Sequence, residues 1–183
     1  MDNRRGVQKG LAMLVRAAAP ADLPGILAIY NEVIATSTAV YALAPVSLDE
    51  RAAWFDARLR AGYPVLVAAA GAQIVGFSSF GEWRGAWPGY RYTVEHSVHV
   101  GADQRGKGIG RQLVEALFPL AAQMSKHVMI GGVDADNAAS LRFHQRLGFV
   151  QVARFKEVGH KFGRWLDLVF MQRFLDPPGA ARA

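Results

Sequence analysis

The sequence predicts an α+β domain, a three-layer α/β arrangement in which helices cover both faces of a mixed, mostly antiparallel sheet. Length and composition support this: of 183 residues, 51% are hydrophobic and 20% are charged, as in a globular chain with one core. Segments with the period of a helix also alternate with segments typical of strands. We expect one domain over residues 13–175, a possible N-terminal tail over 1–12 and a C-terminal tail over 176–183.

The first half of the chain contains two predicted helices and three predicted strands. Leu23, Ile26 and Val33 recur at helical spacing, and Ser47 with Glu50 forms a capping box that starts the second helix. The expected elements are a strand at 13–17, a helix opening at 20–23, a helix from 47, and strands at 65–70 and 73–80. A tight turn at 71–72 makes the last two strands antiparallel neighbours.

The second half alternates strands and helices before it ends in a hairpin. Asp136 and Asn137 can cap a helix that Gly148 ends. The expected elements are a strand at 90–100, a helix at about 108–123, a strand core at 128–130, a helix from 136 to 147, and two final strands that start at 149 and lie around 159–163. A crossover through a helix makes one strand pair parallel.

A glycine-rich basic turn joins the strand at 90–100 to the helix at 108–123. Gly106, Gly108 and Gly110 permit a tight bend and close approach of a ligand to the backbone. The first N–H groups of the helix and its dipole favour an anion, and basic side chains surround them. The turn therefore predicts a phosphate site, most simply for a pyrophosphate. The spacing matches neither a P-loop nor a dinucleotide fingerprint, and a solvated loop is the alternative interpretation.

Charge and composition restrict the partners. The net charge of +6 favours an anionic ligand. The sequence contains no run of five or more basic residues, which disfavours nucleic acid as that ligand. No window of about 18 apolar residues predicts a membrane span. The sequence has no cysteine and no clear targeting segment, so we expect a cytoplasmic protein. We expect no metal, no nucleic acid and no membrane partner.

Glu95 is the candidate general base. Side chains alternate along a strand, so Thr93, Glu95, Ser97 and His99 are expected to share one face that leads into the phosphate turn. A carboxylate at this place can accept a proton from an amine, directly or through one water. The alternative is a surface glutamate paired with an arginine.

Asn137, Ser140 and His144 share one face of the predicted helix, because they lie three to four residues apart. The stretch from Asn137 to Phe149 resembles the pattern N-x-x-[AS]-x-x-x-Y-x-x-x-G-F of the GNAT N-acetyltransferase superfamily, with His144 at the tyrosine position. Histidine suits acid or base duty near neutral pH.

Three stretches together resemble the phosphinothricin N-acetyltransferase family, whose relatives acetylate methionine sulfoximine and methionine sulfone. They are T-V-E-H-S-V from Thr93, the Asn137–Phe149 stretch, and G-H-K-F-G-R-W-L-D over 159–167. The resemblance covers about 14–174 and implies the GNAT fold. His99 departs from the family, whose members commonly carry tyrosine at that place.

The resemblance also implies a set of site residues. Glu95 and His144 match the catalytic positions. The acetyl-CoA cradle matches Val98, His99, Val100, Arg105, Gly106, Lys107, Gly108, Ile109, Gly110, Arg111, Asn137 and Ser140. The acceptor-binding residues are expected to be Trp83, Arg84, Tyr90, Tyr92, Thr93 and Glu95. Lys161, Trp165 and Asp167 are expected either to shape a dimer or to touch the acceptor.

The implied reaction moves an acetyl group from acetyl-CoA to the α-amino group of phosphinothricin, methionine sulfoximine or methionine sulfone, by direct attack and without a metal. Two alternatives stay open. One is a GNAT enzyme with another amine acceptor, such as a protein N-terminus, a polyamine or an antibiotic. The other is a non-catalytic module that binds CoA or nucleic acid. The resemblance also implies a homodimer.

Overall fold

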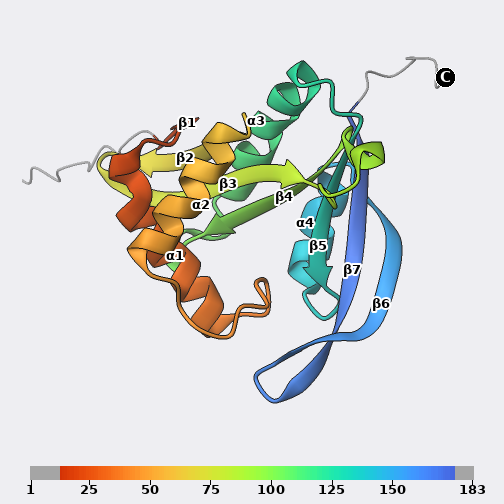
Figure 1. Ribbon diagram of the computed structural model, residues 1–183. Coiled ribbons are helices and arrows are strands. Elements are labelled where there is room, and N and C mark those ends of the chain that lie inside the picture. Colours follow the sequence, from red (N-terminus) through yellow and green to blue (C-terminus); the bar gives the residue numbers. More distant parts are fainter. Residues whose placement is uncertain (1–12, 176–183) are drawn as a thin grey trace, which may run out of the picture.

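Seven strands and four α-helices make up residues 13–175, the part of the chain that the computed structural model describes (Figure 1). The elements run in the order β1 (Met13–Ala17), α1 (Leu23–Thr36), α2 (Leu48–Arg60), β2 (Val65–Ala70), β3 (Gln73–Glu82), β4 (Thr93–Val100), α3 (Ile109–Gln123), β5 (Val128–Asp134), α4 (Ala138–Arg146), β6 (Val150–Lys161) and β7 (Arg164–Phe174). This order confirms the predicted succession of elements. The expected tails at 1–12 and 176–183 lie outside the described residues.

The strands form one mixed sheet in the order β1-β2-β3-β4-β5-β7-β6. Every neighbouring pair is antiparallel except β4 with β5, which α3 connects. Helices α1 and α2 cover one face of the sheet, and α3 and α4 cover the other (Figure 1). The expected α+β architecture with a mostly antiparallel sheet and helices on both faces is confirmed.

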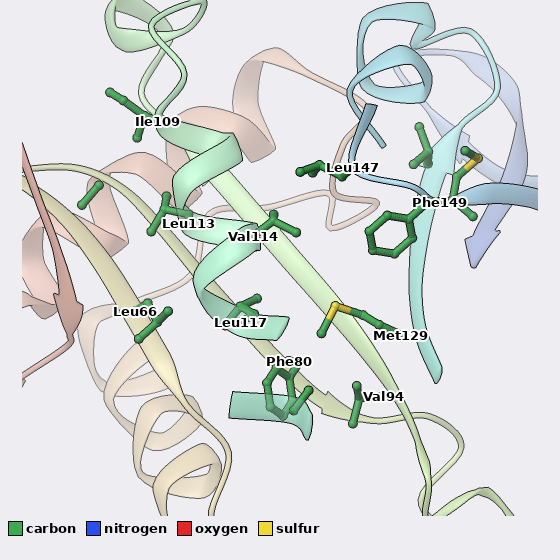
Figure 2. Packing of buried hydrophobic residues seen from close by; sticks show 14 of the residues in the cluster. Leu66, Phe80, Val94, Ile109, Leu113, Val114, Leu117, Met129, Leu147 and Phe149 are labelled. Carbon is green, nitrogen blue, oxygen red and sulfur yellow. The ribbon is translucent and has the colours of Figure 1, made fainter. Parts of the chain in front are cut away.

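The core consists of two clusters, one on each face of the sheet. On one face Leu113 and Leu117 of α3 pack with Phe80, Met129 and Phe149, all nearly inaccessible to solvent (Figure 2). On the other face, α1 and α2 pack on β2 and β3 through a second cluster formed by Leu23, Ile26, Ile29, Phe55, Val65, Val67 and Phe77. Burial of these apolar side chains fixes the helices against both faces of the sheet.

Local signals explain where the helices begin. Ser47 Oγ accepts a hydrogen bond from the Glu50 amide at 3.2 Å, and Glu50 Oε2 accepts one from the Ser47 amide at 2.7 Å, which completes the predicted capping box. Gly108, the N-cap residue of α3, has φ +80°, a conformation that favours glycine. The long strand starts at Thr93 rather than at residue 90, because residues 88–90 form a 3₁₀ turn.

The β4–β5 pair opens part of the way along its length. β4 stays in register with β3 as far as Val100, opposite Gly76, but its parallel pairing with β5 ends at Glu95 opposite Ile130. Beyond Glu95 the two strands diverge within the sheet. A ligand is often bound where neighbouring strands part in this way.

Candidate active site

Two hollows meet at the divergence of β4 and β5. A cavity of about 510 Å³ lies on the α1 and α2 side, and a groove of about 770 Å³ runs along the glycine-rich turn and α4. Both are lined by Ala39, Val98, His99, Asn137 and Ser140. The two hollows therefore lie side by side and share a wall, as adjoining sites for two reactants would. We call them the acceptor cavity and the anion groove.

The anion groove is lined by eleven of the twelve residues expected to hold acetyl-CoA; Lys107 is the exception, with Nζ donating to Gln104 at 2.9 Å. Gly106 and Gly108, with φ of +79° and +80°, turn the backbone before α3. Ile109 is the first residue of α3 and lines the groove, so the N–H groups of the first helical turn, which have no partner within the helix, lie beside it. An extended polyanion fits this combination of exposed amides and positive charge.

Arg142 and Arg146 on α4 also line the anion groove, and sequence reasoning missed both. They lie four residues apart on one helical face. The same spacing had already identified Asn137, Ser140 and His144, so the signal was present in the sequence. These arginines add positive charge to the part of the groove that α4 lines.

Glu95 lies at the last paired position between β4 and β5, and its side chain lines the acceptor cavity. Burial raises the pKa of the Glu95 carboxyl above its usual range, and the Arg58 guanidinium acts in the opposite direction by a smaller amount. Arg58, on α2, lines the same cavity. A carboxylate with a raised pKa is a stronger base than an exposed one. Glu95 is half-buried rather than on the open surface, and Arg58 is the neighbouring arginine that the alternative interpretation expected.

His144 is buried on α4 and lines the acceptor cavity. Its Nδ1 lies 2.8 Å from the carbonyl oxygen of Ser140, one turn earlier. A carbonyl oxygen only accepts, so Nδ1 carries the proton and Nε2 keeps its lone pair in the neutral ring. Burial lowers the pKa of His144, and the hydrogen bond to Ser140 opposes this effect. The ring is therefore neutral at neutral pH and able to accept a proton at Nε2.

His96 is a second buried histidine that sequence reasoning did not select. Its ring centroid lies 5.2 Å from that of His144 and 5.2 Å from that of Phe149. Neither ring nitrogen has a hydrogen-bond partner among residues 13–175. Burial, together with the fields of His144 and His99, lowers the pKa of His96 to about 3. Gly131 leaves room for both rings, since a Cβ there would lie 2.8 Å from His96 Nε2 and 3.0 Å from His144 Nε2.

His99, at the position where the family commonly has tyrosine, packs against Tyr30 of α1 and Phe77 of β3. Its ring lies 5.1 Å from that of Phe77 and 5.7 Å from that of Tyr30. Burial, with the charges of Arg51 and Arg105, lowers the pKa of His99 to about 4. The side chain therefore faces the acceptor cavity as a neutral ring, while residues 98–100 also border the anion groove.

Of the six expected acceptor-binding residues, only Glu95 lines the acceptor cavity. Trp83 packs on Phe170 at 5.0 Å, and exposed Arg84 lies 5.5 Å from the ring of Tyr90. Within the described chain these side chains are not brought together around Glu95, and their part in acceptor binding stays a prediction. The cavity is instead walled by residues that sequence reasoning did not select for the site: Tyr30, Arg51, Trp54, Arg58 and Phe77.

Lys161 of the late motif is 3% exposed, and its Nζ donates to the carbonyl oxygens of Ser37 at 2.9 Å and Val40 at 2.7 Å. It thereby ties the β6–β7 hairpin to the segment after α1, whose Val40 lines the acceptor cavity. Asp167 accepts from Arg154 at 2.9 Å and from the Glu157 amide at 2.9 Å. Lys161 therefore supports the cavity wall, and Asp167 supports the shape of the hairpin.

Residues 13–175 contain no group of three or more histidine, cysteine or acidic side chains arranged to hold a metal ion. Over the same range, no helix has the length and apolar character needed to cross a membrane.

Comparison with known proteins agrees with the fold. Residues 26–149 match the family model described as acetyltransferase (GNAT) family. A methionine sulfoximine/methionine sulfone acetyltransferase of Pseudomonas paraeruginosa is 52% identical over 91% of this chain and 97% of its own. An L-amino acid N-acyltransferase of Escherichia coli is 49% identical over 90% of this chain and 95% of its own.

A solved structure supports the same assignment. The phosphinothricin acetyltransferase of Sinorhizobium meliloti in complex with acetyl-CoA superposes with a TM-score of 0.87 at 33% identity, covering 93% of this chain and 92% of that one. The family predicted from the motifs is thereby confirmed. The chain belongs to the acetyltransferase (GNAT) family, in the group that contains methionine sulfoximine, methionine sulfone and phosphinothricin acetyltransferases.

Proposed function

We propose that this protein transfers the acetyl group of acetyl-CoA to the α-amino group of a small amino-acid-like acceptor such as methionine sulfone, methionine sulfoximine or phosphinothricin. The observation that carries the proposal is the position of Glu95, a half-buried carboxylate where β4 and β5 part and the acceptor cavity adjoins the anion groove. The named activities of the relatives support this acceptor class.

The anion groove holds acetyl-CoA in this proposal. The glycine-rich turn and the N-terminus of α3 receive the pyrophosphate, and the divergent edge of β4 offers backbone amides to the pantetheine arm. Asn137 Oδ1 accepts from the Ser140 amide at 3.0 Å and so caps α4 beside the same groove. Acetyl-CoA supplies an activated thioester carbonyl, and no metal takes part.

Glu95 and His144 divide the proton transfers. The protonated acceptor amine first gives one proton to Glu95, whose raised pKa makes this transfer less uphill. When the amine attacks the thioester, a second proton leaves the nitrogen for His144 Nε2, which is free to accept it. His144 then gives this proton to the departing CoA sulfur. The products are the N-acetyl amino acid, CoA thiol and one proton, which Glu95 returns to solvent.

A homodimer is part of the proposal, and the β6–β7 hairpin supports it. Apolar side chains on this hairpin, which extends from the sheet in Figure 1, are about half exposed or more. They are Val152, Phe155, Val158, Phe162 and Trp165. Clusters of exposed apolar side chains commonly mark protein interfaces. A cytoplasmic location stays a prediction.

An acceptor panel with acetyl-CoA tests the proposal, with free thiol release and the mass of the product as readouts. Methionine sulfone, methionine sulfoximine and phosphinothricin should each release thiol and gain one acetyl group. A polyamine, a peptide with a free N-terminus and an aminoglycoside should give far less. Turnover with one of those three compounds and none with the amino acids would replace the proposed acceptor class.

A further inference from the structure

We propose that Arg51 is the counter-ion of the acceptor's α-carboxylate, so that the enzyme selects free α-amino acids over their amides and over simple amines. This inference rests on the proposed function and adds the residue that defines the substrate class. Arg51 belongs to no motif, and neither the sequence analysis nor the mechanism above uses it.

Arg51 is a buried cation without an anionic partner. It is 5% exposed, and its guanidinium carbon lies 3.7 Å from the ring centre of Tyr30 and 4.6 Å from that of Trp54. Its Nε has no hydrogen-bond partner, and Arg51 takes part in none of the ion pairs found within residues 13–175. The two aromatic rings hold the guanidinium in place through cation–π contacts and supply no negative charge.

A buried charge normally has an ionic partner, because burial without one is costly. Burial lowers the pKa of Arg51, and the Tyr30 hydroxyl offsets part of this effect. Arg51 nevertheless stays charged, since a guanidinium is not deprotonated in proteins. Its side chain lines the acceptor cavity together with Glu95. The cavity therefore contains a fixed positive charge that an anionic group of a bound ligand can neutralise.

Arg58, the second guanidinium of the cavity, differs in its surroundings. It lies two helical turns after Arg51 on α2, and both Glu95 and Glu82 exert a favourable field on it. Gly81 allows its close approach to β3, since a Cβ there would lie 1.3 Å from Arg58 Nη1. Arg58 also forms no ion pair within residues 13–175, and its Nε has no hydrogen-bond partner. The fields of Glu95 and Glu82 nevertheless compensate part of its charge, whereas no carboxylate acts on Arg51 in this way. Arg51 is therefore the cavity cation that lacks a negative charge from the protein.

The chemistry of the acceptor identifies the group that Arg51 meets. Methionine sulfone has a neutral side chain, so its α-carboxylate is its single negative charge. That carboxylate lies two bonds from the amine that Glu95 deprotonates, and a planar guanidinium can bind a carboxylate through two parallel hydrogen bonds. Amino-acid amides, peptide N-termini and polyamines lack this carboxylate. Binding at Arg51 would therefore exclude all three.

The test compares methionine sulfone with methionine sulfone amide in the full-length enzyme. We measure kcat/KM for both acceptors in wild type, Arg51→Gln, Arg51→Lys and Arg60→Gln, a control on the exposed side of the same helix. Loss of a charge-assisted hydrogen bond predicts that the acid-to-amide ratio falls about 10- to 100-fold in Arg51→Gln, mainly through KM for the acid. Dividing one variant's ratio by the other's cancels the different basicities of the two amines.

Each outcome decides a different point. The inference is supported if the ratio falls in Arg51→Gln, falls less in Arg51→Lys and is unchanged in Arg60→Gln. An unchanged ratio in a folded Arg51→Gln that binds acetyl-CoA normally would overturn the role of Arg51 and leave the proposed function standing. If Arg51→Gln does not fold, Arg51→Lys and the wild-type ratio still decide, since a wild-type ratio near one overturns the inference. Wild-type turnover of neither acceptor would overturn the proposed function as well.

Discussion

Replacement of His96 should reduce the acid sensitivity of the fold. His96 has a pKa of about 3 in the folded protein and about 6.5 when exposed, because burial and two neighbouring histidines disfavour its charged form. Below pH 6.5 the unfolded chain therefore binds a proton at this side chain, and the folded chain does not until about pH 3. The free energy of unfolding falls as the pH is lowered through this window.

The size of the effect follows from the two pKa values. Between pH 7 and pH 5, preferential protonation of the unfolded state at His96 lowers the free energy of unfolding by about 2 kcal/mol. His96→Leu removes the titrating group and keeps an apolar side chain beside Phe149. The loss of stability between pH 7 and pH 5 should therefore be smaller by about 2 kcal/mol in the variant than in wild type.

Urea unfolding followed at pH 7 and pH 5 measures this difference, since the comparison is made within each protein and any cavity left by the substitution cancels. His160→Gln is the matched control, because His160 lies exposed on β6 and should keep the wild-type loss. An equal loss in wild type and His96→Leu would refute the reasoning that His96 is buried in its neutral form.

Three further predictions concern the site. The charge of Arg58 opposes the rise that burial causes in the pKa of Glu95, so Arg58→Gln should move the acidic limb of the kcat/KM profile to higher pH. An acidic limb that does not move would show that it does not report the ionisation of Glu95. Gly108→Ala places a side chain at φ +80°, which costs about 1–2 kcal/mol of backbone strain, and should raise KM for acetyl-CoA. Gly62→Ala is the control: it has the same kind of strain at φ +75° but lies away from the groove, and should leave KM unchanged. Gly131→Ala brings a Cβ to 3.0 Å from His144 Nε2 and should lower kcat with acetyl-CoA affinity retained; unchanged turnover would argue against proton transfer at His144.

The parts of the site that the sequence predicted are those with local signals. The glycine-rich turn before α3 and the spacing of Asn137, Ser140 and His144 depend on neighbouring residues, and the structure places them along one groove. The Ser47 capping box is equally local and forms as predicted. Periodicity likewise predicted the order of the elements, because each element buries one face.

The acceptor cavity could not be predicted in the same way, because its walls meet only through tertiary packing. Arg51 and Trp54 look like ordinary residues of an amphipathic helix until α2 packs beside Tyr30 of α1. His96 follows Glu95 in β4, so its side chain points to the opposite face of the sheet, and the alternation along the strand did not select it. Conversely, the aromatic and basic loop after β3 has a suggestive composition, yet Arg84 is directed to Tyr90 in the described chain.

The measurement that tests the account most directly is kcat/KM for N-acetylation of methionine sulfone by wild type and Glu95→Gln, with the product identified by mass. We predict one N-acetyl product per thiol released in wild type and a decrease of roughly 10²- to 10⁴-fold in Glu95→Gln, with acetyl-CoA binding retained. Equal turnover by both proteins, or no acetylation of methionine sulfone by wild type, would contradict the central claim that Glu95 activates an amino-acid amine in the cavity beside β4.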